Sequence, residues 1–339
     1  MKVVRLHGGR DLRLHTEPDP IPGPGETVVR VSAVALCGSD LHWFSGAGIG
    51  GVKLESPLIL GHEFSGLIED REGGVLRVAV DPAVPCGQCR LCREGHPNLC
   101  QTLRFAGHGV EDGALREKMA WPDQCLHSLP DSLNEIDGAM LEPLGVAIHA
   151  VDLGRLKPGT KVGVFGSGPI GLMVVQLARL MGAIQIIATD KLSHRLEAAR
   201  TFGATSVFQA RDGEESPEIW DITGGEGVDV AFEVACENAA VETAVASACP
   251  GATVVLVGIP ADERTTFQAS TARRKGLTIR LCRRMKHTYP RAIRLVEKGL
   301  VDVRSLVTHR FSIDKYRQAF AVAERREGLK VVIEPTRSE

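Results

Sequence analysis

The chain has 339 residues, of which 43% are hydrophobic and 24% are charged, and its formal net charge is −2 at pH 7. This length and apolar content suit two domains with separate cores. The small net charge argues against nucleic acid or an anionic membrane as the main partner. We find no signal-peptide pattern and no apolar run that could span a bilayer. We therefore expect a cytoplasmic protein whose nine cysteines are thiols or metal ligands rather than disulfides.

The chain opens with strand-like stretches. Residues 27–35 have the composition of a strand, and the preceding segment 18–25 is a connector rich in proline and glycine. This pattern predicts an antiparallel, barrel-like first domain rather than a βαβ unit.

The first cluster of polar residues has the composition of a metal site. Cys37 and, after a glycine-rich loop, His62 and Glu63 are competent zinc ligands, and a catalytic zinc commonly keeps three protein ligands and an open position. Asp40 could brace the ligand histidine. For Cys37 or His62 alone, a buried thiol or a hydrogen-bonded core histidine is the simpler interpretation.

Several residues could act beside such a metal. Ser39 and His42 could pass a proton outward. His108 lies in the glycine-rich loop 105–113, where it could face a substrate or be a solvated loop histidine. Glu142 starts an apolar, helix-compatible segment, and an acid in that setting needs a cation or a hydrogen-bond partner. A surface carboxylate at a helix start is the alternative for Glu142.

The strongest metal signal is a run of four cysteines, Cys86, Cys89, Cys92 and Cys100. Four thiolates so close in sequence predict a closed tetrahedral structural zinc site. The alternative is an iron–sulfur cluster, but the bacterial-type run has a closer final cysteine followed by proline, and Gln101 stands here instead. The remaining single cysteines are predicted to be core thiols: Cys125, Cys236, Cys249 and Cys282.

Residues 161–190 have the order of a dinucleotide-binding βαβ unit. A strand at 162–165 leads into the turn Gly166-Ser167-Gly168-Pro169-Ile170-Gly171, which is followed by a helix at 172–181 and a strand at 184–189. Backbone N–H groups that open the helix, together with its dipole, would hold the phosphates.

Each conspicuous residue of this unit has a physical role. Gly166 allows the tight turn, Gly168 lets the backbone approach the pyrophosphate, and Gly171 lets the helix pack closely on the strand. Asp190 would accept hydrogen bonds from both ribose hydroxyls and repel a 2′-phosphate. It therefore favours NAD over NADP.

After this unit, helices and strands continue to alternate, which predicts a doubly wound parallel sheet. Gly258 follows one of these strands at the end where such sheets present ligands. Arg283, Arg284 and Lys286 form a basic cluster, most often a solvated face. The C-terminal tail should return to the first domain. The predicted elements are strands at 206–208, 228–234, 253–257, 277–281 and 330–333, helices at 192–202, 238–248, 290–298 and 313–325, and a helix or loop at 214–223.

Together these residues resemble the zinc-dependent medium-chain dehydrogenases, and within them the sorbitol (L-iditol) dehydrogenase group, over essentially the whole chain. The resemblance implies an α/β protein with two domains. A GroES-like β-barrel catalytic domain would comprise residues 1–145 and 284–339, and a doubly wound Rossmann NAD-binding domain would comprise residues 146–283.

The resemblance also implies roles for the polar residues. Cys37 and His62 would bind a catalytic zinc, with Glu63 as a ligand in the resting enzyme and Glu142 at the zinc or on its bound water. The four-cysteine run would bind one structural zinc per chain. The NAD site would include the glycine turn with Pro169 and Ile170, the selecting pair Asp190 and Arg195, the nicotinamide wall Val257, Gly258 and Ile259, and the substrate-side neighbours Cys282 and Arg283.

The implied reaction is oxidation of a secondary alcohol of a polyol to a ketose, and its reverse. Ser39 and then His42, or a water held by Glu142, would carry the proton away, while NAD accepts the hydride. The alternative substrates are a sugar acid such as L-idonate, or L-threonine. The segment Glu142-Pro143-Leu144 favours a polyol, whereas Arg283 and Arg284 would suit a carboxylate. An NAD-binding structural protein is the alternative without activity. A homotetramer or homodimer is implied.

Two departures from the family pattern bear on the substrate and the surface. Glu72 stands where a small residue is usual, and the turn 70–76 looks shortened, which predicts a trimmed surface hairpin. The segment 283–290 is one residue longer and more basic than the sorbitol-type pattern.

Overall fold

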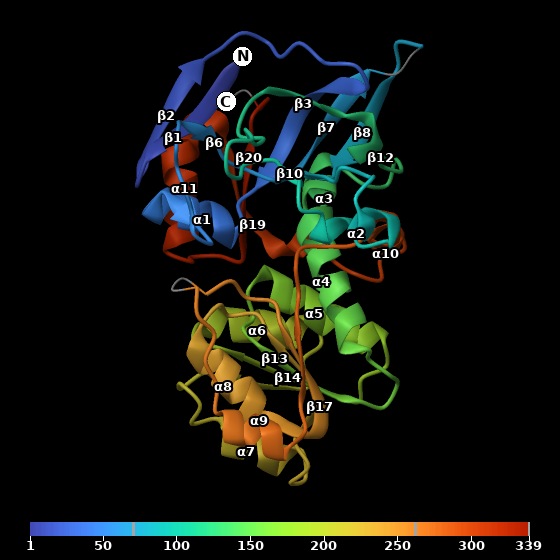
Figure 1. Cartoon of the computed structure of the whole chain (residues 1–339), viewed down its shortest axis with the longest axis vertical. Helices are drawn as coiled ribbons and strands as arrows, with labels where there is room; N and C mark the ends of the chain where they lie inside the picture. The colour runs from blue at the N-terminus through green and yellow to red at the C-terminus, as the bar shows by residue number, and fades with distance from the viewer. Residues whose placement is uncertain (70–71, 261–262, 338–339) are drawn as a thin grey trace. The chain divides into compact units, whose positions relative to one another are not determined.

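The computed structural model describes residues 1–69, 72–260 and 263–337 and divides into two compact units. One unit combines Met1–Pro143 with Tyr289–Glu339, and the other is Leu144–Thr288. The two ends of the chain, blue and red in Figure 1, meet in the same unit. The second junction falls later than residues 283–284, because Met285 and Thr288 pack against Gly145, where a Cβ atom would lie within 2.7 Å of both.

The first unit is built on a largely antiparallel seven-stranded sheet. Its strand order is β12-β8-β7-β3-β20-β19, with β11 also paired to β3, and a three-stranded sheet of order β2-β1-β6 accompanies it. The strands are β1 (Lys2–Gly8), β2 (Asp11–Thr16), β3 (Glu26–Ala35), β6 (Leu58–Ile59), β7 (Glu63–Glu69), β8 (Val75–Val80), β11 (Lys118–Pro122), β12 (Leu126–Ser128), β19 (Val307–Ser312) and β20 (Lys330–Glu334). Short pairs are β4 (Gly48–Ile49) with β5 (Val52–Lys53), and β9 (Ala83–Val84) with β10 (Arg104–Phe105).

The C-terminal tail completes this sheet. β20 pairs antiparallel with β3, with Val332 opposite Ala35, and β19 runs parallel to β20. The sequence did not predict β19, in which exposed and half-buried residues alternate without a strong apolar signal. The helices of this unit are α1 (Gly38–Gly46), α2 (Arg90–Arg93), α3 (Glu135–Ala139), α10 (Tyr289–Glu297) and α11 (Tyr316–Glu324), and α4 (Leu141–Gly154) runs from this unit into the next.

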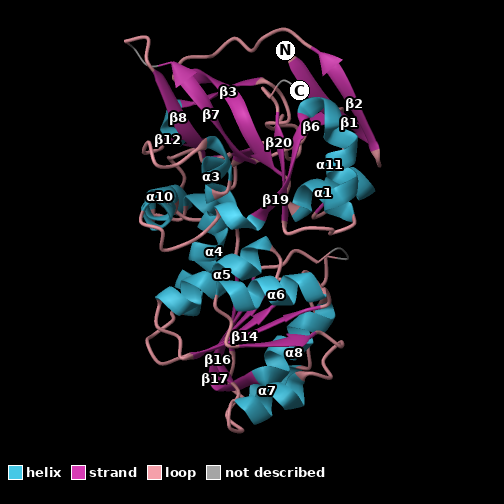
Figure 2. Cartoon of the chain, turned by 180° about the vertical axis from the view of Figure 1, so that it is seen from behind, coloured by secondary structure: helices cyan, strands magenta, loops and turns pink. Residues whose placement is uncertain are grey.

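The second unit is a six-stranded parallel sheet of order β15-β14-β13-β16-β17-β18. This is the doubly wound order predicted from the sequence, with its switch point between β13 and β16. The helices α5 and α6 contact each other on one face, and α7 and α8 contact each other on the opposite face (Figure 2). The elements are β13 (Lys161–Phe165), α5 (Pro169–Leu180), β14 (Gln185–Asp190), α6 (Ser193–Phe202), β15 (Ser206–Gln209), α7 (Ser216–Ile222), β16 (Val228–Glu233), α8 (Asn238–Ser247), β17 (Ala248–Leu256), α9 (Ala269–Arg274) and β18 (Thr278–Leu281).

Two differences from the predicted elements have local causes. β17 starts at Ala248 rather than at 253, because its register against β16 shifts between Val228 and Val230 and so accommodates the turn-forming Pro250 and Gly251. α9 was not predicted from the sequence, because it is short and mostly exposed and so has little apolar periodicity.

The predicted hairpin turn includes Asp70 and Arg71, which lie outside the described residues. Of the helices that the structure describes, none has the length and apolar content needed to cross a membrane.

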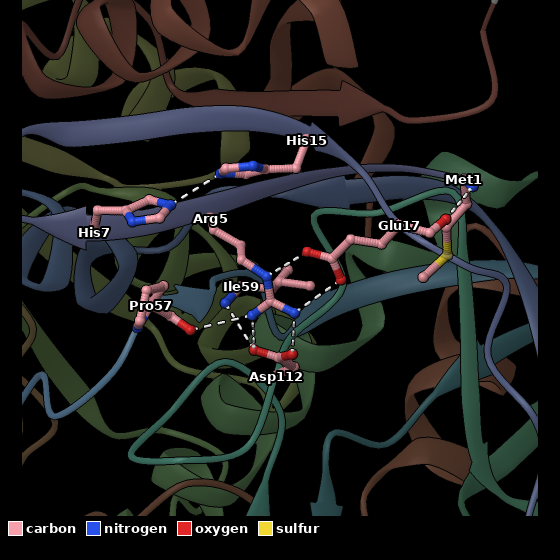
Figure 3. A network of polar contacts seen from close by, with 8 residues as sticks. All are labelled: Met1, Arg5, His7, His15, Glu17, Pro57, Ile59 and Asp112. Atoms are coloured by element: carbon pink, nitrogen blue, oxygen red, sulfur yellow. Dashed lines mark hydrogen bonds and ion pairs between the residues drawn. The ribbon is translucent and has the colours of Figure 1, made fainter.

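A partly buried arginine ties the N-terminal strands to the glycine-rich loop 105–113. The guanidinium of Arg5 donates to both carboxylate oxygens of Glu17, at 2.6 and 3.0 Å, and to both of Asp112, at 3.0 and 2.9 Å (Figure 3). It also donates to the carbonyl of Pro57, and Asp112 accepts from the backbone N–H of Ile59. Such forked pairs hold two carboxylates in fixed positions, so one side chain connects four segments.

We expect Arg5→Met to lower the free energy of unfolding by about 1.5–3 kcal/mol, the usual range for hydrogen bonds to charged groups. It should also speed amide exchange in residues 108–113. The control is Arg13→Met, because Arg13 lies opposite Arg5 in the strand register but pairs with Asp11 in solvent. Differential scanning calorimetry and hydrogen exchange should show a much smaller effect there. Equal effects of the two substitutions would contradict this account.

Candidate active site

Three potential metal ligands come together where β3 ends and β7 begins, within the first unit's sheet. One ligand atom each of Cys37, His62 and Glu63 lies within 4.8 Å of the others. Cys37 follows the end of β3 and precedes α1, while His62 and Glu63 lead into β7, which pairs with β3. The pairing of two strands therefore converts a separation of twenty-five residues into a single cluster.

Asp40 holds the two halves of this cluster together. Its carboxylate is completely buried and accepts hydrogen bonds from the backbone N–H of Cys37 at 2.9 Å and of Gly61 at 3.0 Å. One carboxylate oxygen also lies 3.4 Å from Nδ1 of His62. Gly61 has a φ of +93°, and a Cβ atom there would lie 2.7 Å from Val34. The backbone turn that aims His62 therefore depends on glycine.

The charges in this cluster favour a cation. Although burial opposes the charged ring, Asp40 and Cys37 raise the pKa of His62 well above its ordinary value. Burial similarly opposes the charge of Asp40, but His62 and two backbone N–H groups lower the pKa of its carboxyl. A metal ion bound by His62 would replace the proton that these neighbours attract.

The donor set fits zinc. Thiolate, imidazole and carboxylate are the side chains that zinc takes, and ligand atoms around a tetrahedral zinc are roughly 3.3–3.8 Å apart. The ligand atoms of Cys37, His62 and Glu63 lie within 4.8 Å of one another, which is compatible with that spacing. Because Asp40 faces Nδ1 of His62, Nε2 remains for the metal, an arrangement that fixes the tautomer and orientation of a ligand histidine.

Glu142 is buried and lies near the cluster, but among the described residues it is not one of the grouped ligand atoms. Burial raises the pKa of its carboxyl to about 8, opposed by His62 and reinforced by Glu63. The interpretation as a surface carboxylate is wrong, because only 5% of the residue is exposed. It occupies the first turn of α4.

One residue of the cluster was not predicted from the sequence. Lys330, the first residue of β20, is buried, and its ammonium lies 2.5 Å from a carboxylate oxygen of Glu63. Burial acts against the charge, but Glu63 and Cys37 raise the pKa of Lys330. The available signal was a lysine that starts the otherwise apolar strand Val331-Val332-Ile333.

The residues predicted to move a proton lie on or near α1. The hydroxyl of Ser39 is 3.4 Å from Nε2 of His62. His42 follows Ser39 by three residues on the same helix and so lies on the same side of it. Burial, and then the charge of Arg326, lower the pKa of His42. His108 is half-buried against Trp43, at 5.6 Å between ring centroids, so the interpretation as a freely solvated loop histidine is wrong.

The four cysteines of the predicted structural site also come together. Their sulfur atoms lie within 4.8 Å of one another, around the short helix α2. Backbone N–H groups point at the sulfurs, from Cys89 to Cys86 at 3.3 Å and from Cys86 to Cys100 at 3.4 Å. Two backbone hydrogen bonds lower the pKa of Cys86 to about 6, and desolvation raises that of Cys92 to about 12. The set fits a closed tetrahedral zinc site.

The single cysteines differ in burial. Cys125 is buried, and burial raises its pKa to about 12, as expected for a core thiol. Cys249 and Cys282 are half-buried. The prediction is wrong for Cys236, which is exposed and has a φ of +65°. It lies in the turn after β16, where its backbone N–H donates to Glu233.

The glycine turn of the second unit has the geometry expected for a dinucleotide site. Gly166 has a φ of +110°, and a Cβ atom there would lie 2.7 Å from the backbone of Ala235. A Cβ atom on Gly171 would lie 1.9 Å from the carbonyl of Gly166. At Gly168 the nearest atom is 3.6 Å away, in Arg195, so the protein's own packing does not require glycine there. The close approach of a ligand to the backbone would require glycine at this position.

Asp190 supports this turn through hydrogen bonds to the backbone. Its carboxylate accepts from the backbone N–H of Ser167 and of Leu192, both at 2.9 Å. Arg195 lies 3.8 Å from the same carboxylate. Pro169 and Ile170 open α5 and are half-buried. The acid therefore has a structural contact in addition to its predicted selecting role.

A second buried acid organises the neighbouring strand ends. Glu233, at the end of β16, accepts hydrogen bonds from the backbone N–H of Ala235 at 2.8 Å, Cys236 at 2.7 Å and Gly258 at 3.3 Å. It was missed because an acid at a strand end has no distinctive spacing. Its hydrogen bond with Gly258 holds the backbone of the segment that includes Val257 and the exposed Ile259.

Cys282 follows β18, where its N–H donates to the carbonyl of Leu256, and Arg283 beside it is exposed.

A dinucleotide turn in one unit and a thiol–imidazole–carboxylate cluster in the other define a metal-dependent oxidoreductase. The alcohol dehydrogenase GroES-like domain model matches residues 23–131, and the zinc-binding dehydrogenase model matches residues 169–298. The sorbitol dehydrogenase of Bacillus subtilis is 36% identical, over 99% of this chain and 98% of that protein. The L-idonate 5-dehydrogenase of Vitis vinifera is 33% identical, over 94% of this chain and 90% of that protein. A solved Escherichia coli oxidoreductase of unknown specificity has a TM-score of 0.92 and 30% identity, covering 98% of each chain.

The chain belongs to the zinc-binding medium-chain dehydrogenases, in the group of the sorbitol dehydrogenases. It is a zinc-dependent oxidoreductase that uses NAD. The predicted fold class, a GroES-like domain with a Rossmann domain, is confirmed. The family favours zinc over an iron–sulfur cluster at the four cysteines. The roles of individual residues stay predictions.

We expect elemental analysis to find two zinc ions per chain in protein purified without chelator. Cys37→Ser should remove one of them, and Cys89→Ser should remove the other and lower the melting temperature, because a structural zinc contributes folding free energy. Cys125→Ser, in a buried thiol outside both clusters, is the control and should keep both. A zinc content unchanged by Cys37→Ser would remove that site from this account.

Removal of the charge at Asp190 should narrow the preference for NAD. Asp190→Asn keeps one backbone acceptor and the shape of the side chain, so the glycine turn should persist. We expect the ratio of kcat/KM for NAD to that for NADP to fall by at least about tenfold, or about 1.4 kcal/mol. Glu197→Gln, an exposed charge change on α6, should leave the ratio unchanged. Equal use of both cofactors by the unchanged protein would show that Arg195 or Lys191 dominates.

Proposed function

We propose that the protein oxidises a secondary alcohol of a polyol to a ketose with NAD and catalyses the reverse reduction. The observation that carries this proposal is the buried carboxyl of Glu142 beside the cluster of Cys37, His62 and Glu63. Sorbitol dehydrogenases are among the relatives of the chain. A glutamate followed by Pro143 and Leu144 is the version of this segment typical of polyol dehydrogenases.

The side chains suit proton removal from an alcohol. A zinc ion held by Cys37, His62 and Glu63 would act as a Lewis acid that lowers the pKa of the substrate hydroxyl. Ser39, 3.4 Å from His62, would take the proton and pass it to His42. Glu142, with a pKa raised to about 8 by burial, could instead hold a water or a substrate hydroxyl by a hydrogen bond. In the second unit, the N–H groups at the start of α5 would hold the NAD pyrophosphate.

Two other functions have specific support. A sugar acid such as L-idonate fits the basic cluster of Arg283, Arg284 and Lys286, and one relative is an L-idonate 5-dehydrogenase. L-Threonine would also need a cation for its carboxylate. The hypothesis of an NAD-binding structural protein has less support, because this chain keeps Cys37, His62, Glu63 and Ser39 in one cluster.

We further propose that the enzyme is a homotetramer or homodimer.

A substrate screen separates the polyol from the acid. We expect NAD reduction with sorbitol, xylitol or related polyols to exceed that with aldonates and threonine. Arg283→Ala should weaken all polyols by roughly 1–3 kcal/mol through the loss of a charged hydrogen bond. If the substrate were an aldonate, the variant would lose the acid almost completely and keep the matching neutral alcohol. Arg273→Ala, an exposed arginine of α9, is the control. Efficient oxidation of an aldonate with negligible activity on polyols would overturn the proposal.

A further inference from the structure

A pair of histidines on the N-terminal hairpin stands apart from the two ligand clusters described above. His7 in β1 and His15 in β2 are both half-buried, and their Nε2 atoms lie 2.9 Å apart (Figure 3). The ring centroids are 5.1 Å apart. Neither histidine contributes to the cluster at Cys37 or to the four-cysteine cluster. The pair therefore needs an explanation of its own.

The two rings meet across the hairpin although their residues are not partners in the strand register. β1 and β2 are antiparallel, and His15 is opposite Val3, which precedes His7 by four residues. The register shifts between Leu6 and Gly8, so His7 lies at a bulge of β1. A bulge bends its strand and changes the direction of the side chain that it carries. In Figure 3 the two rings extend toward each other along the hairpin.

This contact puts two metal-binding atoms side by side. In the neutral pair, one ring donates its Nε2–H to the lone pair of the other ring. That proton only has to move to Nδ1 for both Nε2 lone pairs to become free for a metal ion. Bonds of roughly 2.0–2.1 Å from imidazole nitrogens to a metal, at a right angle to each other, place the two nitrogens roughly 2.8–3.0 Å apart. The observed separation is 2.9 Å, so the rings need to turn but not to approach each other.

The charges around the pair favour a cation. Arg5 pairs with Glu17 and Asp112, and Arg13 pairs with Asp11. Three carboxylates thus accompany two guanidinium groups, which leaves a net charge of −1 beside the pair. A divalent ion bound by two neutral imidazoles would be attracted by this charge.

The protonation of the pair also favours a metal at neutral pH. Burial lowers the pKa of His7 most, followed by the charges of Arg13 and His15, while Asp11 acts in the opposite direction. A lowered pKa keeps the ring in the neutral form, which is the form that binds metals. Acidification should therefore release the ion.

We propose that His7 and His15 form a peripheral binding site for a divalent transition-metal ion, with copper(II) bound more tightly than nickel(II) or zinc(II). Two adjacent nitrogens with water at the other positions suit the tetragonal geometry of copper(II), which also has the highest affinity in the first-row series. The ion would join β1 to β2. The site has no thiolate and keeps open positions, so it holds metal more weakly than the four-cysteine site, and dialysis should empty it.

The test adds up to one equivalent of copper(II) to the zinc-loaded protein. The electron paramagnetic resonance spectrum should be axial, with superhyperfine splitting from two imidazole nitrogens, and it tests the site without any substitution. In calorimetric titrations, His7→Gln and His15→Gln should each weaken copper binding by at least about tenfold, because each removes one of the two nitrogens. The control is His309→Gln, in a half-buried strand histidine outside the pair, which should leave copper binding unchanged.

Hydrogen exchange provides a second measurement. Copper should slow amide exchange in β2 of the unchanged protein but not of His15→Gln, since the ion joins the two strands. A spectrum with fewer than two coupled nitrogens would overturn the inference, as would equal copper affinity in the pair variants and the control. Intense copper–thiolate absorption from the first equivalent would also overturn it, because copper would then prefer the cysteines. The inference does not depend on the reaction, so polyol inactivity would overturn the proposed function alone.

Discussion

The pairing of β3 with β7 on one side and β20 on the other is the constraint on which the active site depends. Ala35 is opposite Glu63 in one pair and opposite Val332 in the other. Cys37 lies just beyond the end of β3, after Leu36, so one short stretch of sheet brings together a thiol, a carboxylate and the ammonium of Lys330. The C-terminal tail thus contributes to the site, because β20 carries Lys330, the only buried lysine or arginine among the residues that the structure describes.

Buried acids perform the finer positioning in both units. Asp40 binds two backbone N–H groups and faces the ring of His62, and it therefore fixes the distance between the two halves of the metal cluster. In the second unit, Asp190 and Glu233 bind backbone N–H groups of the turns next to the switch point. Each carboxylate offers several acceptor positions, so one side chain can hold two loops at once. This common device explains why charged residues occur in otherwise apolar surroundings.

Much of the fold could be predicted because its signals are local. The glycines at 166 and 171 stand where the backbone leaves no room for a Cβ atom, so the turn can be predicted from the positions of its glycines. The cysteine spacing from Cys86 to Cys100 likewise reflects one short loop folded around one point. Element boundaries were less predictable. β17 starts earlier than its apolar run, because a register shift against β16, and not propensity, sets its first residue.

The sequence by itself determined the ligand types, the glycine turn and the family, since these depend on residue identity and short spacing. Only the tertiary structure decided that Lys330 faces Glu63, that Glu142 is buried beside the metal ligands and that Cys236 is exposed. These facts depend on which strands pair and in which register, because a shift of one residue turns every side chain of a strand to the opposite face. Contacts between the two ends of the chain have no signature in either end alone. The folded sheet creates them.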